Sequence, residues 1–85
     1  MSKLPQFFPA TVYSPFKTYF DGEASMLSAN NKSGRFDILP GHINFLCLLS
    51  PGMLRIETDG KATEFELNKG ILQVVDGAAY VFVNI

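Results

Sequence analysis

The second half of the chain alternates apolar and polar side chains with a period of two, which is the pattern of a half-buried β-strand. Over Met53–Thr58, Leu54 and Ile56 fall on one face, while the charged residues Arg55 and Glu57 fall on the other. Asp59-Gly60 follows, a pair suited to a two-residue hairpin turn because both positions accept a positive φ. Lys61–Leu67 then alternates in the same way. The pattern predicts a β-hairpin.

The last two predicted strands, Ile71–Val75 and Ala78–Ile85, are apolar on both faces. A strand of an antiparallel sandwich usually exposes one face to water. Two interpretations remain open: the core is unusually crowded, or one face is covered by another protein.

Turn signals are frequent in the first half as well, and they leave no stretch long enough for an ordinary helix. Ser14-Pro15 and Asp21-Gly22 are the first of these predicted turns. The strands expected between the turns are Ala10–Tyr13, Thr18–Phe20, Ala24–Ala29 (weak), Arg35–Leu39 and Ile43–Leu49. Short strands at this spacing predict an all-β domain, a sandwich or a barrel. Residues 1–9, with two prolines, are expected to form an arm or an irregular edge strand.

The composition excludes several classes of function. Eighty-five residues make one domain. Charged residues are 18% of the chain, fewer than the roughly 25% of typical soluble domains, so part of the apolar surface is expected to belong to a partner. The formal net charge of −1 argues against binding to nucleic acid. No apolar run approaches the roughly 20 residues of a membrane-spanning helix, and we expect no secretory signal; the default compartment is the cytosol.

Candidate chemical groups are few. The single cysteine, Cys47, lies in an apolar run, which favours a buried thiol over a nucleophile. The single histidine, His42, follows Pro40-Gly41 without a neighbouring nucleophile or acid, and we interpret it as a structural or interface residue. No phosphate-binding loop is present. We therefore expect no catalytic residue, no cofactor and no metal site.

Four segments resemble one known family. They are Tyr19–Ala24 (YFDGEA), Gly34–His42 (GRFDILPGH), Ser50–Ile56 (SPGMLRI) and Lys69–Val74 (KGILQV). Their order and spacing are similar to those of the epsilon subunit of rotary F-type ATP synthase, called delta in mitochondria. The most specific segment is Ile38-Leu39-Pro40-Gly41-His42.

This resemblance implies a flattened antiparallel β-sandwich of about ten short strands over residues 10–85, without the C-terminal helical hairpin of the family. It implies a non-catalytic subunit of the central stalk that links the gamma subunit to the c-ring during proton-driven ATP synthesis. Membrane association would occur only through the complex, on the cytoplasmic face of the inner or plasma membrane or in an organelle. No ATP binding is expected, because the family's nucleotide site lies on the absent helices.

The segment most similar to the family also departs from it. Arg35 stands where the family usually carries an acid, and Asp37 where glycine is common, in the loop that the resemblance assigns to the c-ring contact. The alternative function is a stand-alone epsilon-like binding module outside the synthase. The residues expected to bind partners are Arg35, Phe36, His42, Tyr80 and Phe82.

Overall fold

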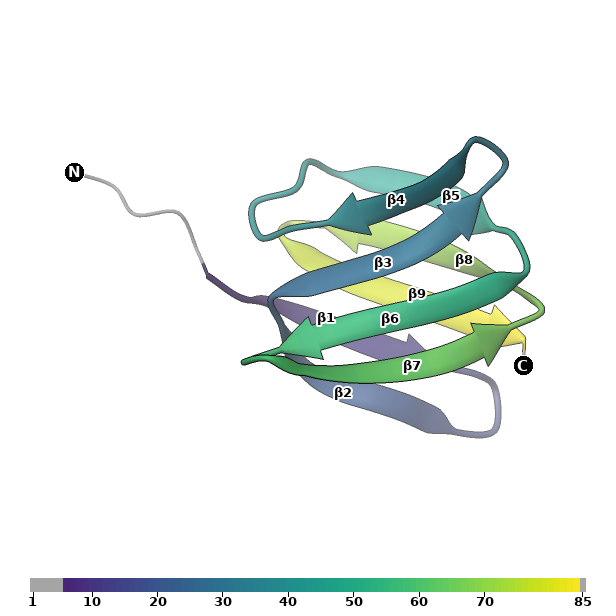
Figure 1. Cartoon of the computed structure of the whole chain (residues 1–85), viewed down its shortest axis with the longest axis horizontal. Coiled ribbons are helices and arrows are strands. Elements are labelled where there is room, and N and C mark those ends of the chain that lie inside the picture. Colours follow the sequence, from purple (N-terminus) through teal and green to yellow (C-terminus); the bar gives the residue numbers. More distant parts are fainter. Residues whose placement is uncertain (1–5, 85) are drawn as a thin grey trace.

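The computed structural model describes residues 6–84, and the described residues form strands without any helix (Figure 1). The nine strands are β1 (Phe8–Tyr13), β2 (Thr18–Ala24), β3 (Met26–Asn31), β4 (Gly34–Ile38), β5 (Phe45–Leu49), β6 (Gly52–Thr58), β7 (Lys61–Leu67), β8 (Lys69–Val75) and β9 (Ala78–Asn84). The predicted all-β fold is confirmed, with nine strands where about ten were expected.

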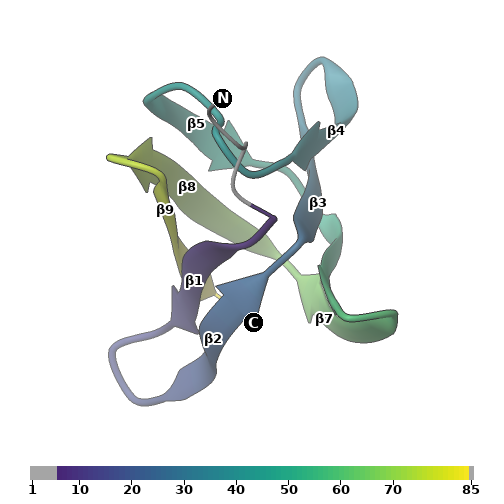
Figure 2. The same cartoon turned by 90° about the vertical axis from the view of Figure 1, so that its left-hand side faces the viewer.

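The strands form two sheets that face each other as the layers of a sandwich (Figure 2). One sheet has five strands in the order β2-β1-β9-β8-β5, and the other has four in the order β4-β3-β6-β7. Neighbouring strands are antiparallel except for β1 and β9, which pair in parallel. β9 is the return strand of the β8–β9 hairpin, and it lies beside β1, whose other neighbour is β2.

The chain changes sheets at Ser25 and not at Asp21-Gly22, where the sequence predicts a turn. β2 continues through both of those residues because they pair with Thr11 and Ala10 of β1. At Ser25, the backbone N–H and the side-chain hydroxyl both donate to the carbonyl oxygen of Glu57, at 2.7 and 2.9 Å. These bonds hold the short connection between the sheets.

The two-residue turn predicted at Asp59-Gly60 is confirmed, and Asp76-Gly77 forms a second turn of the same kind. Asp59 and Gly60 have φ angles of 50° and 78°, and Asp76 and Gly77 have nearly the same values. Both central residues therefore occupy the left-handed region, which suits the twist of a tight antiparallel hairpin.

The core lies between the sheets and takes only one face of each strand. Leu72, Val74, Val81 and Val83 are at most 2% exposed and point into it. Alternate residues of β8 and β9 point outward and stay partly exposed. The two apolar faces of β8 and β9 are therefore not both buried in the core. Another reason is needed for the apolar side chains on their outer face.

The sandwich begins two residues before the boundary expected from the sequence. Phe8 is only 3% exposed and belongs to the core, so it starts β1, and Pro9 follows it on the exposed side of that strand. Residues 1–5 of the expected arm and Ile85 lie outside the described residues.

Candidate docking surface

The outer side of the five-stranded sheet carries a group of apolar side chains, with one polar residue, Gln73, among them. We call Leu46, Leu48, Ile71, Tyr80 and Phe82 the outer apolar face. Leu48, Ile71 and Phe82 stand in one row across β5, β8 and β9 because they are register partners. Leu46 and Leu48 are 67% and 71% exposed, and the other three are between 37% and 43% exposed. A patch of this kind on a small domain is typical of a protein-binding surface.

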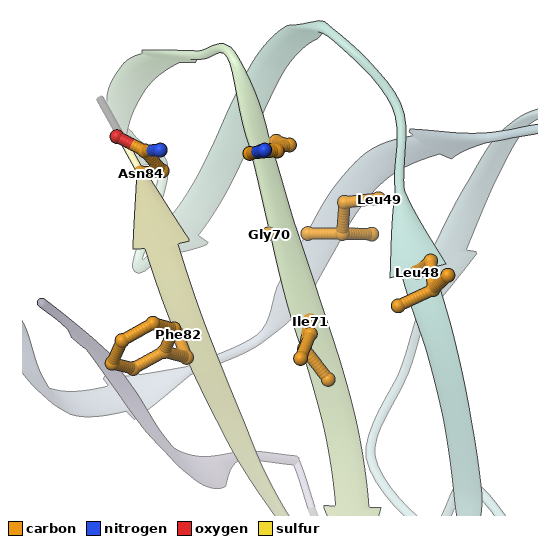
Figure 3. A pocket seen from close by; sticks show the side chains of 7 residues that line it. Leu48, Leu49, Gly70, Ile71, Phe82 and Asn84 are labelled. Atoms are coloured by element: carbon orange, nitrogen blue, oxygen red, sulfur yellow. The ribbon is translucent and has the colours of Figure 1, made fainter.

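A hollow of about 450 Å³ opens alongside this row (Figure 3). Leu48, Ile71 and Phe82 come from three neighbouring strands to line it, together with Leu49, Lys69, Gly70 and Asn84. The Lys69 ammonium is the only charged group among the lining residues. The Tyr13 ring contacts Phe82 edge-on, with centroids 5.4 Å apart, and holds it in position. The arrangement suits an apolar side chain of a partner, with a polar group near its rim.

The turn between β1 and β2 extends this surface. Phe16, at its tip, is 96% exposed, and a second hollow of about 350 Å³ lies between Phe16, Tyr19 and Phe82. The Phe16 N–H donates to the Ser14 hydroxyl, so the turn presents the ring on a defined backbone.

Phe36 and His42 lie elsewhere, where β4 and the β4–β5 loop meet β5. Both rings contact Phe45 edge-on, at centroid distances of 5.9 and 5.5 Å. His42 Nδ1 is 2.8 Å from the carbonyl oxygen of Ile43, which can only accept a hydrogen bond. Nδ1 is therefore the donor in this contact, which leaves Nε2 for a partner. Leu39 and Ile43, in the same loop, are exposed.

Arg35 lies on the four-stranded sheet and has a structural contact that the sequence did not suggest. Its Nη1 donates to the carbonyl oxygen of Met53 at 2.7 Å and, at 3.4 Å, to Oδ1 of Asn30. The guanidinium therefore connects edge strand β4 to β6. Arg35 is exposed, as a solvated loop charge would be, but it is also part of the sheet's internal bonding.

We expect Arg35→Gln to lower the free energy of unfolding by about 1 kcal/mol or less, since the hydrogen bond is real but exposed. This corresponds to a fall of a few degrees in melting temperature. Lys32→Gln removes the same charge from the adjacent exposed turn and serves as the control. Equal melting temperatures for the two variants would show that the Met53 contact contributes nothing.

The five residues predicted from sequence thus occupy three separate places. Tyr80 and Phe82 share the outer apolar face, Phe36 and His42 share the Phe45 cluster, and Arg35 lies apart from both groups, where it bonds to Met53. The sequence did not single out Leu46, Leu48 and Phe16, whereas Ile71 belongs to a strand whose two apolar faces already indicated a covered surface. For Leu46 and Leu48 the available signal was the unbroken apolar run Phe45–Leu49.

Few reactive or metal-binding groups come together among the described residues. Burial raises the pKa of the Cys47 thiol, and a hydrogen bond with Asn31 opposes this only partly, so the thiol is protonated at neutral pH. Within residues 6–84 no three His, Cys, Asp or Glu side chains gather to hold a metal ion. No helix in the same part of the chain could span a membrane.

Comparison with known proteins identifies close sequence relatives. Residues 8–85 match the family described as ATP synthase, Delta/Epsilon chain, beta-sandwich domain. The chain is 35% identical over 72 residues to the ATP synthase epsilon chain of Trichlorobacter lovleyi, with 85% of this chain and 52% of that protein covered. It is 38% identical over 64 residues to the epsilon chain of Psychrobacter cryohalolentis, covering 74% and 46%. The chain spans about half the length of these curated relatives.

Solved structures share the fold at lower identity. A chain in the cryo-EM structure of Euglena gracilis mitochondrial ATP synthase matches with a TM-score of 0.86 and 20% identity, over 96% of this chain and 53% of that one. A chain in the central stalk and c-ring structure of Tetrahymena thermophila mitochondrial ATP synthase matches with a TM-score of 0.79 and 24% identity, over 99% and 67%.

Proposed function

Because the chain belongs to the delta/epsilon family of ATP synthase subunits, we propose that it is the β-sandwich part of a non-catalytic rotor subunit. In this role it joins the gamma subunit to the c-ring in the central stalk. The observation that carries the proposal is the outer apolar face, an exposed row of large side chains on a sandwich of this family. Its membrane association, at the cytoplasmic face or in an organelle, comes only through the complex.

The outer apolar face is the proposed contact with gamma. Removing apolar surface from water contributes about 25 cal/mol per Å² before the costs of association are subtracted. Rings and branched side chains that stand on a rigid sheet lose little further freedom on binding. Phe82 already contacts Tyr13, so its position is set before the partner arrives. Torque transmission requires a contact of this rigid kind.

The β3–β4 turn is the proposed contact with the c-ring, as the family resemblance implies. It is short and polar: the Ser33 N–H donates to Oδ1 of Asn31 at 2.8 Å, and Lys32 is exposed beside it. Arg35 follows at the start of β4. Charges at the rim of an interface mainly govern the rate of encounter and its salt dependence. A basic turn therefore fits an acidic loop on the ring.

Reconstitution tests this proposal. The tagged 85-residue chain is mixed with gamma subunit and, separately, with detergent-solubilised c-ring from the same source, and retention is measured. We expect gamma to be retained through apolar contact that survives high salt, and c-ring binding to weaken as salt rises. Retention of neither partner would instead favour a stand-alone binding module, for which the changed charge at Arg35 is the supporting observation.

A further inference from the structure

Within residues 6–84 the two sheets have four edge strands, and one of these four carries no charged residue. The edges are β2 and β5 in one sheet and β4 and β7 in the other. Charged residues on edge strands prevent unwanted pairing with other chains. They are Asp21 and Glu23 in β2, Arg35 and Asp37 in β4, and Lys61, Glu64 and Glu66 in β7. β5 reads Phe-Leu-Cys-Leu-Leu and has none.

β5 is also open to solvent. Leu46 and Leu48 are the most exposed apolar side chains of its sheet's strands. Phe45 and Cys47, which point toward the other sheet, are only half-buried. Within residues 6–84 the β5 backbone pairs with β8 on one side, and no described strand pairs with its other side. That side presents N–H and C=O groups ready to accept another strand.

We propose that two copies of the free chain pair through β5, antiparallel, about a two-fold axis at Cys47. This register overlaps all five residues, placing Cys47 opposite Cys47 and Leu46 opposite Leu48 of the second copy. Each five-stranded sheet then continues into the other across the axis. Backbone hydrogen bonds form along the seam, and the two exposed leucines of each copy meet those of its partner.

The strand's own chemistry selects a second copy as the occupant. In the symmetric register every position faces an apolar side chain, and no like charges oppose each other because β5 carries none. The net charge of −1 adds little repulsion between copies. Self-association of the free chain goes beyond the rotor role and does not depend on it.

Paired charges test the register. Leu46→Lys/Leu48→Lys places two lysine pairs directly opposite each other across the seam, whereas Leu46→Lys/Leu48→Glu places a lysine opposite a glutamate twice. Both variants lose the same two leucines, and both change exposed positions outside the core. Sedimentation equilibrium should give a dimer dissociation constant about tenfold or more higher for the first variant than for the second.

Oxidation of Cys47 gives a second, independent readout. Opposed residues of antiparallel strands lie about 4.5–5.5 Å apart at Cα, within the range of a disulfide of about 4.4–6.8 Å. Mild oxidation should therefore trap the wild-type dimer. In Cys47→Ser/Leu48→Cys the two thiols are diagonal neighbours about 7–8 Å apart, and trapping should be at least several-fold slower.

Three results would overturn the proposal. One is a wild-type chain that stays monomeric up to about 1 mM, the weak limit of specific association. Another is an equal dissociation constant for the two charge variants, which would point to contact through a face and not through the edge. The third is equal trapping of the two cysteine positions. None of these results bears on gamma binding, which is measured separately.

Discussion

Replacing Ile71 and Phe82 with lysine is expected to abolish binding of the gamma subunit while leaving the fold intact. The two side chains are register partners on β8 and β9 and line the same hollow. A partner seated there would have to desolvate two ammonium groups without counter-charges. Central apolar anchors commonly contribute 2 kcal/mol or more each, so the loss should exceed about 100-fold in dissociation constant.

The matched control is Met53→Lys/Ala62→Lys, which adds the same charge to exposed positions on the outer side of the four-stranded sheet. Calorimetry of both variants with gamma, together with thermal melts, separates docking from stability. Full gamma affinity in Ile71→Lys/Phe82→Lys would mean that the outer apolar face is not the gamma contact.

Local sequence patterns predicted the hairpins of this fold well because each is determined within a dozen residues. The alternation of Leu54 and Ile56 and the Asp59-Gly60 turn all appear as expected. Asp21-Gly22 shows the limit of this approach. The same dipeptide type stays extended here because β2 continues to pair with β1 well beyond the turn that joins them, and the residues beside the dipeptide give no sign of how far that pairing extends.

The docking surface was harder to predict than the fold. The outward direction of Tyr80 and Phe82 follows from alternation on β9, and both were identified. Leu46 and Leu48 were not, since an uninterrupted apolar strand looks the same in a sheet's centre and at its edge. Only the strand order, which places β5 last in its sheet, explains their exposure. Arg35 was missed as a structural residue for a related reason, because Met53 lies on a strand that β4 does not pair with.

The largest effect on stability is expected from a substitution at Gly52, which lies where β3 and β6 separate. The two strands pair only from Met26 to Ser28, and beyond this point the Asn30 carbonyl accepts instead from the Ser50 N–H at 2.9 Å. The Asn30 side chain fills the gap against Gly52, and its Oδ1 accepts from Arg35. A glycine is required at this position for two reasons: its φ is +149°, and a Cβ there would collide with Nδ2 of Asn30.

Gly52→Ala should therefore lower the free energy of unfolding by about 2–3 kcal/mol, because backbone strain of this kind costs about 1–3 kcal/mol and the collision adds to it. For a domain of this size the melting temperature falls by roughly 10–20 °C.

Gly41→Ala is the control for strain alone, since its φ is +82° and no atom lies within 4 Å of the added Cβ. The free energy of unfolding of Gly41→Ala should fall by about half as much as that of Gly52→Ala. Asn30→Ala/Gly52→Ala removes the collision but keeps the strain. Its free energy of unfolding should therefore fall by less than the sum of the decreases in Asn30→Ala and in Gly52→Ala. A Gly52→Ala protein that melts no lower than Gly41→Ala would show that Asn30 moves aside freely, and that the junction between β3 and β6 does not depend on this contact.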